Sequence, residues 1–387
     1  MKLFNTLVIT SLFLVLVGCT KNPPGINQCA TNLSYVTNAT TIGDDAIKGA
    51  AKYLAKITLG SDEDVVHLKL DTGSSNLIIN ASNFSYGDDT ITGQKAYVYD
   101  SGTNRSIAIN AQDEIGLGCF DDIKAKFSLT AKDDSAENVL GLGFGDKERL
   151  PHEAQVPAFF GQLVKNTDAN NLFSLALCGY KPTSHVLFGG VDQRMKGLVG
   201  KFVPIIERSA FVVPAETLRL MDSKKVIGKF DQYDPESKTG IKTYLDSGTA
   251  FLLLPPKMAQ NFATVVSARA EELGFANSIS PNFYRTARSV STTTARFESE
   301  AQIRQFPRFE ITFQGADGTT KALELSPRHY LKPMHPHDPL QRTFAVRESN
   351  DDTVLGQPFL ENHYLVFDRK NNAVGFGNID VACASAK

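Results

Sequence analysis

Two short segments of the chain set an aspartate beside hydroxyl side chains and a glycine, between apolar residues. The first is Asp71-Thr72-Gly73-Ser74 within LKLDTGSSNLII, and the second is Asp246-Ser247-Gly248-Thr249 within YLDSGTAFLLLP. A carboxylate between core-like residues costs free energy unless it has hydrogen-bond partners or a chemical role. Each segment alone could be a turn in which the Asp side chain bonds the local backbone. The alternative is that the two aspartates form one site.

The order of motifs along the chain favours a shared site. Val139-Leu140-Gly141 follows the first segment, and Val354-Leu355-Gly356 follows the second. Motifs repeated in the same order predict two lobes of related design. Asp100-Ser101-Gly102-Thr103 also fits the four-residue pattern, but polar residues follow it and it lies close to Asp71 along the chain. We therefore interpret it as a hairpin turn.

Two aspartates in contact could act together as an acid and a base. Because both carboxyls cannot ionise cheaply at short range, the pair holds one shared proton over a broad acidic range. The ionised carboxylate can deprotonate a water molecule while the protonated one polarises a peptide carbonyl. The glycines at 73 and 248 allow a close backbone approach. The hydroxyls at 72, 74, 247 and 249 can donate hydrogen bonds to carboxylate oxygens.

The elements that would position this pair are mostly strands. The chain has 387 residues, which is long for a single core, so two lobes are expected. Short Val-, Ile- and Thr-rich runs bounded by Gly, Asn and Asp predict an all-β body with few helices. Helical spacing occurs at 156–166 and 255–275, each with a proline near its start. With 40 basic and 42 acidic residues, the charge balance gives no indication of nucleic-acid binding.

The first residues of the chain have the pattern of an export signal. An apolar run ends in Leu16-Val17-Gly18-Cys19, which is similar to the cleavage box of bacterial lipoproteins. This pattern predicts a signal peptide over 1–18, lipid attachment at Cys19 and a tether over 19–35. Thr20 then favours the outer membrane, with the protein facing the periplasm or the cell exterior. A plain secretory signal with a chance cysteine is the alternative, and in both cases the protein is exported.

Four further cysteines and a histidine-rich segment could form disulfides or bind metal. An even number of cysteines in an exported protein predicts two disulfides, with three possible pairings. No cysteine has the spacing of a zinc site. His329, His335, His337 and Asp338 cluster in sequence, but prolines interrupt them and helical spacing is missing, so we expect an exposed loop and no metal. No cofactor is expected either. The four cysteines are Cys29, Cys119, Cys178 and Cys383.

Beyond these local arguments, the chain resembles the pepsin-like aspartic endopeptidases, and within them the bacterial, shewasin-like branch. The segments DTGSSNL and LDSGTAFLLLP match the family's two catalytic loops, and VLGLGF and VLGQPFLENHYLVFDRKNNAVGFG match the segments that follow them. The resemblance implies that Asp71 and Asp246 are the catalytic pair. It also implies a bilobal pepsin-like β fold with a central cleft, which we divide into lobes at 36–198 and 199–387.

The family closes its cleft with a β-hairpin flap that carries a tyrosine. Tyr99, in VYDSG, occupies the matching place, although an ordinary strand aromatic is the alternative. The family usually has a Trp after SSNL to bond this tyrosine, but this sequence has Ile78 there and contains no Trp. The family's inter-lobe sheet would bring the two termini together, so that Cys29 and Cys383 could pair. Little room is left after Cys19 for an inhibitory prosegment, so we expect activity to be governed by pH.

These observations predict an aspartic endopeptidase that hydrolyses polypeptides through a water molecule activated by Asp71 and Asp246. Protonation of most carboxylates at about pH 3 would leave 40 basic residues unopposed, so a mildly acidic optimum of about pH 4 is expected. The resemblance implies bulky apolar substrate side chains around the cleaved bond, inhibition by pepstatin-like compounds and a monomer. The competing prediction is a catalytically silent binding or inhibitor protein on the same fold, although both Asp-containing loops are intact.

Overall fold

The computed structural model of the protein describes residues between 28 and 384. The predicted signal peptide and Cys19 lie outside the described residues. The described residues are 28–36, 52–83, 85–87, 90–93, 97–100, 105–131, 137–145, 156–208, 210–275, 284, 294–315, 317–335 and 338–384.

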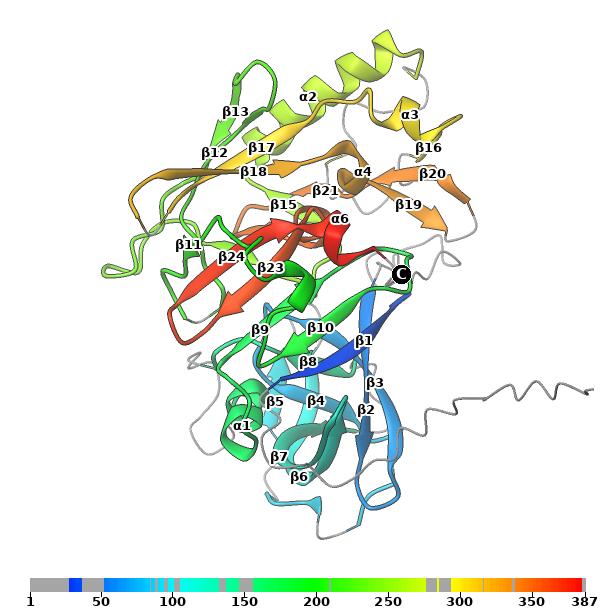
Figure 1. Ribbon diagram of the computed structural model, residues 1–387, viewed down its shortest axis with the longest axis vertical. Coiled ribbons are helices and arrows are strands. Elements are labelled where there is room, and N and C mark those ends of the chain that lie inside the picture. Colours follow the sequence, from blue (N-terminus) through cyan, green and yellow to red (C-terminus); the bar gives the residue numbers. More distant parts are fainter. Residues whose placement is uncertain are drawn as a thin grey trace, which may run out of the picture.

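The first lobe, in the lower part of Figure 1, is a run of seven hydrogen-bonded strands. In order of pairing they are β2 (Lys52–Leu59), β3 (Asp64–Asp71), β8 (Val139–Gly141), β4 (Leu77–Asn80), β7 (Phe120–Thr130), β6 (Arg105–Leu117) and β5 (Tyr97–Asp100). Because β2 also pairs with β6, the run closes on itself. Alternate residues Val66, Leu68 and Leu70 of β3 are buried, so the residues between them project from the opposite face. The helix α1 (Phe159–Asn166) packs against β7.

The second lobe, in the upper part of Figure 1, contains three small sheets and the longest described helix. In order of pairing the sheets are β13 (Val226–Lys229), β12 (Ala215–Leu220), β17 (Phe309–Gln314) and β18 (Thr320–Leu325); β14 (Thr243–Leu245), β22 (Thr353–Leu355), β15 (Leu252–Leu254) and β21 (Val346–Glu348); and β16 (Thr294–Arg296), β20 (Asp338–Phe344) and β19 (Leu331–His335). The helix α2 (Pro256–Glu272) starts with a proline and buries Met258, Phe262 and Val266, which recur every fourth residue. Its short helices, among the described residues, are α3 (Glu300–Ile303), α4 (Pro327–Tyr330), α5 (Gln357–Leu360) and α6 (Ile379–Ala382). The 3₁₀ turn η4 (Gln193–Met195) precedes this lobe and contacts α6.

The two lobes share one strand-pairing pattern, which confirms the repeat read from the motifs. In the first lobe β3 runs parallel to β8, and β4 runs antiparallel to it. In the second lobe β14 runs parallel to β22, and β15 runs antiparallel to it. The Val-Leu-Gly motifs supply the middle strand in each case. The two Asp-containing loops therefore leave equivalent strands of the two lobes.

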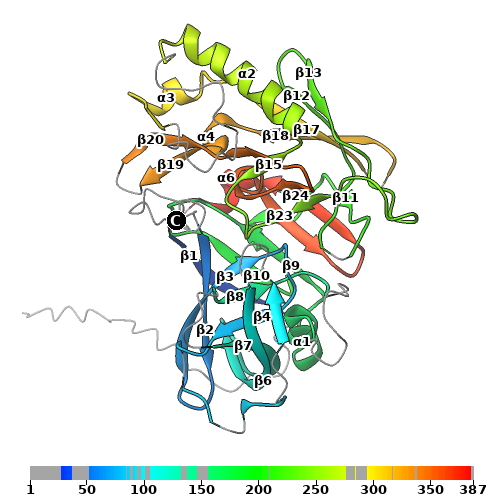
Figure 2. The ribbon, with the colours of Figure 1, turned by 180° about the vertical axis from the view of Figure 1, so that it is seen from behind.

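Six central strands connect the lobes, as Figures 1 and 2 show from opposite sides. In order they are β11 (Val203–Pro204), β24 (Ala373–Asn378), β23 (His363–Asp368), β9 (Leu172–Ala176), β10 (His185–Phe188) and β1 (Cys29–Val36). Here β23 of the second half pairs with β9 of the first, and the rings of Phe173 and Phe367 stack with centroids 4.8 Å apart. The chain from 29 to 35 pairs with β10 and β2, so the tether predicted over 19–35 ends too late.

The predicted helices are confirmed, but one predicted loop is wrong. The patterns at 156–166 and 255–275 correspond to α1 and α2. The segment HYLKPMHPHDP, expected to be an exposed loop, instead ends α4 and forms the antiparallel pair β19 and β20. Leu331 and Lys332 are buried there. The sequence predicts an interruption at Pro333, but proline is compatible with a short strand at the edge of a sheet, and β19, which contains Pro333, is an edge strand.

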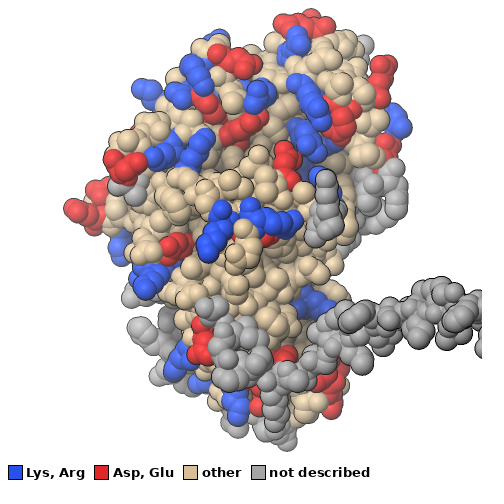
Figure 3. All heavy atoms as spheres, in the orientation of Figure 1, with Lys and Arg blue, Asp and Glu red and all other residues tan. Residues whose placement is uncertain are grey.

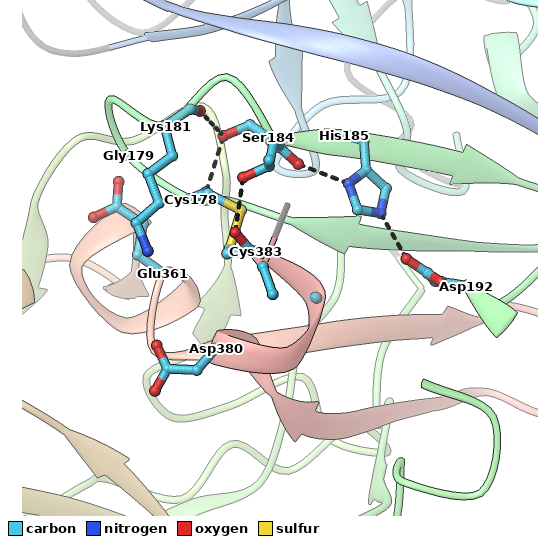
Figure 4. Close-up of a disulfide and its surroundings, with 12 residues drawn as sticks. Cys178, Gly179, Lys181, Ser184, His185, Asp192, Glu361, Asp380 and Cys383 are labelled. Atoms are coloured by element: carbon cyan, nitrogen blue, oxygen red, sulfur yellow. Dashed lines mark hydrogen bonds and ion pairs between the residues drawn. A yellow bond between two sulfur atoms is a disulfide. The ribbon is translucent and has the colours of Figure 1, made fainter. Parts of the chain in front are cut away.

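Two disulfides join the four predicted cysteines, in the pairs Cys29–Cys119 and Cys178–Cys383. The Cys29–Cys383 pair suggested by the family resemblance is therefore wrong. Cys29 begins β1 beside the turn between β6 and β7, where Cys119 lies, whereas Cys383 follows α6. Figure 4 shows Cys383 against the connection between β9 and β10, which carries Cys178. Each disulfide thus fastens one end of the described chain to the nearest loop.

The surface shown in Figure 3 carries basic and acidic side chains interspersed with each other. This mixture agrees with the formal net charge of −2. Within the described part of the chain, the helices are too short or too polar to cross a lipid bilayer.

Candidate active site

The two predicted aspartates occupy matching positions at the ends of parallel strands. Asp71 is the last residue of β3, and Asp246 directly follows β14. The carbonyl oxygen of Asp71 accepts from the Leu142 amide at 2.9 Å, and the Asp246 amide donates to the Leu355 carbonyl at 3.2 Å. Both side chains are half-buried. Each aspartate is thus fixed by the strand that carries the Val-Leu-Gly motif of its own lobe.

Each carboxylate accepts two hydrogen bonds from its own loop. Asp71 accepts from the Gly73 amide at 2.8 Å and from the Ser74 hydroxyl at 2.9 Å. Asp246 accepts from the Gly248 amide at 2.8 Å and from the Thr249 hydroxyl at 2.6 Å. The hydroxyls at 74 and 249 therefore do what the sequence predicts, and they fix the plane of each carboxyl group.

The two inner hydroxyls do something different from the prediction. Thr72 Oγ1 donates to the Leu245 carbonyl at 2.9 Å and accepts from the Ser247 amide at 2.9 Å. Reciprocally, Ser247 Oγ donates to the Leu70 carbonyl at 3.0 Å and accepts from the Thr72 amide at 3.1 Å. Both side chains are fully buried. They bind the loop of one lobe to the loop of the other instead of bonding the carboxylates.

The glycines bring the two carboxyl groups into contact. A β-carbon at Gly73 would lie 2.7 Å from the carboxyl carbon of Asp246, and one at Gly248 would lie 2.6 Å from that of Asp71. Separations this short are not seen between real side chains, so only glycine fits at either position. The structure therefore brings together the two aspartates and the six residues predicted around them, from both lobes.

The electrostatics of the pair match those of two acids that share a proton. Burial and the charge of Asp71 raise the pKa of Asp246 above its ordinary value. A hydrogen bond between the two side chains contributes to the same shift. The arrangement therefore favours the protonated form of the Asp246 carboxyl group at mildly acidic pH.

A cation that the sequence prediction did not use lies beside the pair. Lys69 precedes Asp71 by two residues on β3 and forms an ion pair with Glu137 at 3.4 Å, while Lys52 pairs with the other carboxylate oxygen of Glu137. Burial lowers the pKa of Lys69, but the carboxylates of Asp71, Glu137 and Asp246 outweigh this effect and raise it above its ordinary value. The signal in the sequence was a lysine within the apolar run LKLD.

A buried polar network also reaches the second loop. The side chain of Gln357 donates through Nε2 to the Ser247 carbonyl at 3.0 Å, and its Oε1 accepts from the Lys332 ammonium group at 2.9 Å. Lys332 forms an ion pair with Glu361 at 2.9 Å, and the Tyr53 hydroxyl donates to Glu361 at 2.7 Å. All four network side chains are buried. Gln357 and Glu361 lie in the long motif VLGQPFLEN, but nothing local in the sequence predicted that Lys332 would meet them.

The strands around Tyr99 pair as a hairpin requires. The strand β5 pairs antiparallel with β6, with Tyr99 opposite Ser106 and Asp100 opposite Arg105. The turn between them and the side chain of Tyr99 lie outside the described residues. Ile78 is fully buried in β4, between β8 and β7. Tyr99 as a substrate-covering residue therefore stays a prediction.

The histidine-rich segment is placed in part. His329 is bonded through Nδ1 to the Ser326 hydroxyl at 2.9 Å, and burial lowers its pKa. Asp338 pairs with Arg296. The side chain of His335 and the whole of His337 lie outside the described residues. Among the residues that are described, no group of three or more potential metal ligands gathers.

The comparisons with known proteins agree with this geometry. A sequence model of the family described as eukaryotic aspartyl protease matches residues 52–379, which includes both aspartates. The chain therefore belongs to the eukaryotic aspartyl protease family.

Similar proteins come from animals and fungi. A protein named beta-secretase from Strongylocentrotus purpuratus is 22% identical over 366 residues, which cover 84% of this chain and 66% of that protein. Secreted aspartic protease 1 from Candida albicans is 24% identical over 361 residues, covering 86% of this chain and 82% of the fungal one. Candidapepsin-1 from Candida albicans strain WO-1 shows the same identity and coverage. These matches support the bilobal pepsin-like fold and a peptidase class of function.

Proposed function

We propose that the protein is an aspartic endopeptidase in which Asp71 and Asp246 are the catalytic residues. The observation that carries this proposal is the reciprocal contact of the two loops. Each glycine lies against the carboxyl group of the other lobe, so that a β-carbon added to the glycine would be less than 3 Å from that carboxyl group. An Asp pair held this way can accept and donate a proton at the same reacting centre.

The proposed reaction uses water as the nucleophile. The ionised carboxylate takes a proton from water while the protonated carboxyl donates its proton to the oxygen of the peptide carbonyl. The water oxygen then attacks the carbonyl carbon and forms a tetrahedral diol. Collapse of the diol breaks the C–N bond: the protonated carboxyl gives its proton to the leaving amine nitrogen, while the ionised carboxylate takes a proton from one diol hydroxyl as the C=O bond re-forms. The pair therefore again holds one shared proton. Hydrogen bonds from Gly73, Ser74, Gly248 and Thr249 stabilise the ionised carboxylate throughout.

The substrates proposed are polypeptides, with Tyr99 covering the bound chain and pepstatin-like compounds acting as inhibitors. We further propose a monomer of the shewasin-like branch that works at mildly acidic pH. Two disulfides support export, since disulfides persist in oxidising compartments. Lipid attachment at Cys19 and the outer membrane rest on the sequence pattern. Labelling with a radioactive fatty acid, lost in Cys19→Ser, tests that part.

The central experiment is cleavage of denatured serum albumin at about pH 4 by the wild-type protein and by Asp71→Asn and Asp246→Asn. We expect pepstatin-sensitive cleavage by the wild type and none by either variant. Asn keeps the size of Asp, so circular dichroism should show unchanged folding. Retained cleavage in both variants would refute the assignment of Asp71 and Asp246. A folded protein that binds pepstatin without cleaving would identify the silent binding protein instead.

A further inference from the structure

The face of β3 that carries Asp71 also carries a cation. Because Val66, Leu68 and Leu70 are buried, Lys69 and Asp71 both project from the opposite face of the strand. Two residues along a strand span about 6.6 Å. The α-carbons of Lys69 and Asp71 are therefore about 6.6 Å apart, and both side chains lie on the same side of the sheet.

Lys69 belongs to a group of three charged side chains, which we call the Lys69 cluster: Lys69, Lys52 and Glu137. Glu137 bridges the two lysines through its two carboxylate oxygens. Lys69 lies opposite Leu54 of β2 and Val139 of β8, and Lys52 and Glu137 are each two residues from those partners. The three side chains thus share one face, and their formal charges leave one net positive charge.

The Lys69 cluster is accessible but partly withdrawn from water. The side chains of Lys69, Lys52 and Glu137 are 21%, 24% and 37% exposed. An ion pair formed at such a site is screened less by water and salt than one on the open surface. A ligand carboxylate could therefore reach the cluster and gain more there than at an exposed lysine.

A substrate must lie on this face. The reacting carbonyl has to meet the carboxyl groups of Asp71 and Asp246, and Asp71 projects from the face that Lys69 shares. An extended peptide advances about 3.3 Å per residue. A side chain one or two residues from the cleaved bond therefore comes within reach of the Lys69 ammonium group.

We propose that the Lys69 cluster is a cationic subsite that selects an acidic side chain within two residues of the cleaved bond. This inference rests on the proposed peptidase function and adds a substrate class to it. An Asp or Glu side chain brings the cluster to two positive and two negative charges. A basic side chain would be repelled, and an apolar one would leave the net charge unbalanced.

The carboxylates facing Lys69 keep its ammonium group protonated over the working range, because they raise its pKa. They belong to Asp71 on β3, Glu137 before β8 and Asp246 after β14, and Lys52 on β2 is the second cation of the cluster. Burial raises the pKa of Glu137, but hydrogen bonds and charge from Lys52 and Lys69 outweigh this effect. The pKa of Glu137 is therefore lowered, and this carboxylate stays ionised in mild acid. The substrate carboxylate titrates at about pH 4, so selection should weaken below that pH.

The test compares cleavage sites in one denatured substrate mixture. Wild-type protein, Lys69→Met and Lys56→Met digest denatured serum albumin and casein at about pH 5, where Asp and Glu side chains are mostly ionised. Mass spectrometry then reads the residues around each cleaved bond. Lys56 is the matched control, because it is an exposed lysine of β2 opposite His67, four residues before Asp71.

The wild type and Lys56→Met should show Asp and Glu enriched about three- to tenfold at one position within two residues of the cleaved bond. Lys69→Met should cleave with this enrichment lost. Glu137→Gln, which frees the lysines from their internal anion, should strengthen the enrichment and keeps the test valid if Lys69→Met folds poorly. No enrichment in the wild type, or enrichment that survives in Lys69→Met, overturns the proposal. Absence of any cleavage by the wild type would instead count against the peptidase function.

Discussion

Gly248 lies so close to Asp71 that a β-carbon at residue 248 would be 2.6 Å from the carboxyl carbon of Asp71. The relationship is reciprocal, because Gly73 has the same closeness to Asp246. Neither glycine is therefore only a flexible turn residue. Each one forms the wall against which the other lobe's carboxyl group lies, and together they set the separation of the two acids.

Replacing Gly248 with Ala should separate the two acids and abolish peptidase activity. The added methyl group would have to push Asp71 or its loop away, which removes the shared proton on which the mechanism depends. We expect kcat to fall by at least about a hundredfold, measured with a pepstatin-sensitive peptide assay. Gly161→Ala is the control, because Gly161 is an exposed residue of α1 with no atom within 4 Å of a β-carbon. It should keep full activity and gain about 1 kcal/mol of helix stability. Equal activity of Gly248→Ala and wild type would contradict this account.

The pair should destabilise the fold as it ionises. The folded-state pKa of Asp246 is raised, so its contribution to stability is complete below its ordinary value of 3.8 and is lost as the pH rises through the raised value. Asp246→Asn removes this loss. We expect the variant to be about 1 to 2 kcal/mol more stable than wild type at about pH 7, and equal to it in acid.

Thermal unfolding followed by circular dichroism across this pH range measures the difference between Asp246→Asn and wild type. If stability depends on pH equally steeply in Asp246→Asn and in wild type, ionisation of Asp246 does not destabilise the folded protein. Asp222→Asn, at the turn that follows β12, serves as a control for the loss of one negative charge.

How much of the site could be predicted depends on the range of the interactions. The aspartates, glycines and outer hydroxyls were predictable because Asp71 to Ser74 and Asp246 to Thr249 are repeated local motifs with similar flanks. The lobes and the common strand pattern follow from the same repeat. The bonds of Thr72 and Ser247 to the opposite lobe were not predictable, because they depend on how the two loops face each other.

The misses have a similar cause. Lys332 lies in LKPMHPH, whose prolines and histidines are typical of a loop, and its burial arises only when β19 packs against Glu361 and Gln357. The predicted pair of Cys29 and Cys383 is wrong because Cys29 begins β1 whereas Cys383 follows the helix α6, and sharing a central sheet does not bring these two positions into bonding distance. Cys119 and Cys178 lie in nearer turns. Lys69 was visible in the sequence, but its relation to Asp71 became clear only from the face it shares.

The buried ion pair should be costly to break and less costly to remove. Lys332→Met removes the cation from the buried Glu361 carboxylate and leaves it the hydrogen bond from the Tyr53 hydroxyl, so we expect a loss of about 3 to 5 kcal/mol in the free energy of unfolding. Because Lys332 also bonds Gln357, which holds the Ser247 carbonyl, kcat should fall more than KM changes.

The double variant Lys332→Met with Glu361→Gln tests the charge argument. Gln removes the uncompensated charge but still accepts from the Tyr53 hydroxyl, so the double variant should be more stable than Lys332→Met alone. Urea unfolding of the wild type, both single variants and the double variant gives the coupling free energy. A double variant no more stable than Lys332→Met would show that packing, and not the unpaired charge, causes the loss.

A buried histidine should limit how acidic the working range can be. His363 is buried between the rings of Phe359 and Phe376 and is bonded through Nε2 to the Glu324 carbonyl at 2.9 Å. Burial lowers its pKa from 6.5 to about 3. Below pH 6.5, His363 therefore binds a proton in the unfolded chain but stays neutral in the folded protein, so the free energy of unfolding decreases as the pH falls. The loss reaches about 3 kcal/mol at about pH 4. His363→Gln, which keeps a donor but does not titrate, should flatten this acid slope in chemical unfolding, and His67→Gln on the exposed face of β3 is the control for replacing an exposed histidine. If His363→Gln loses stability in acid as steeply as wild type, the acid limit of this fold lies in other groups.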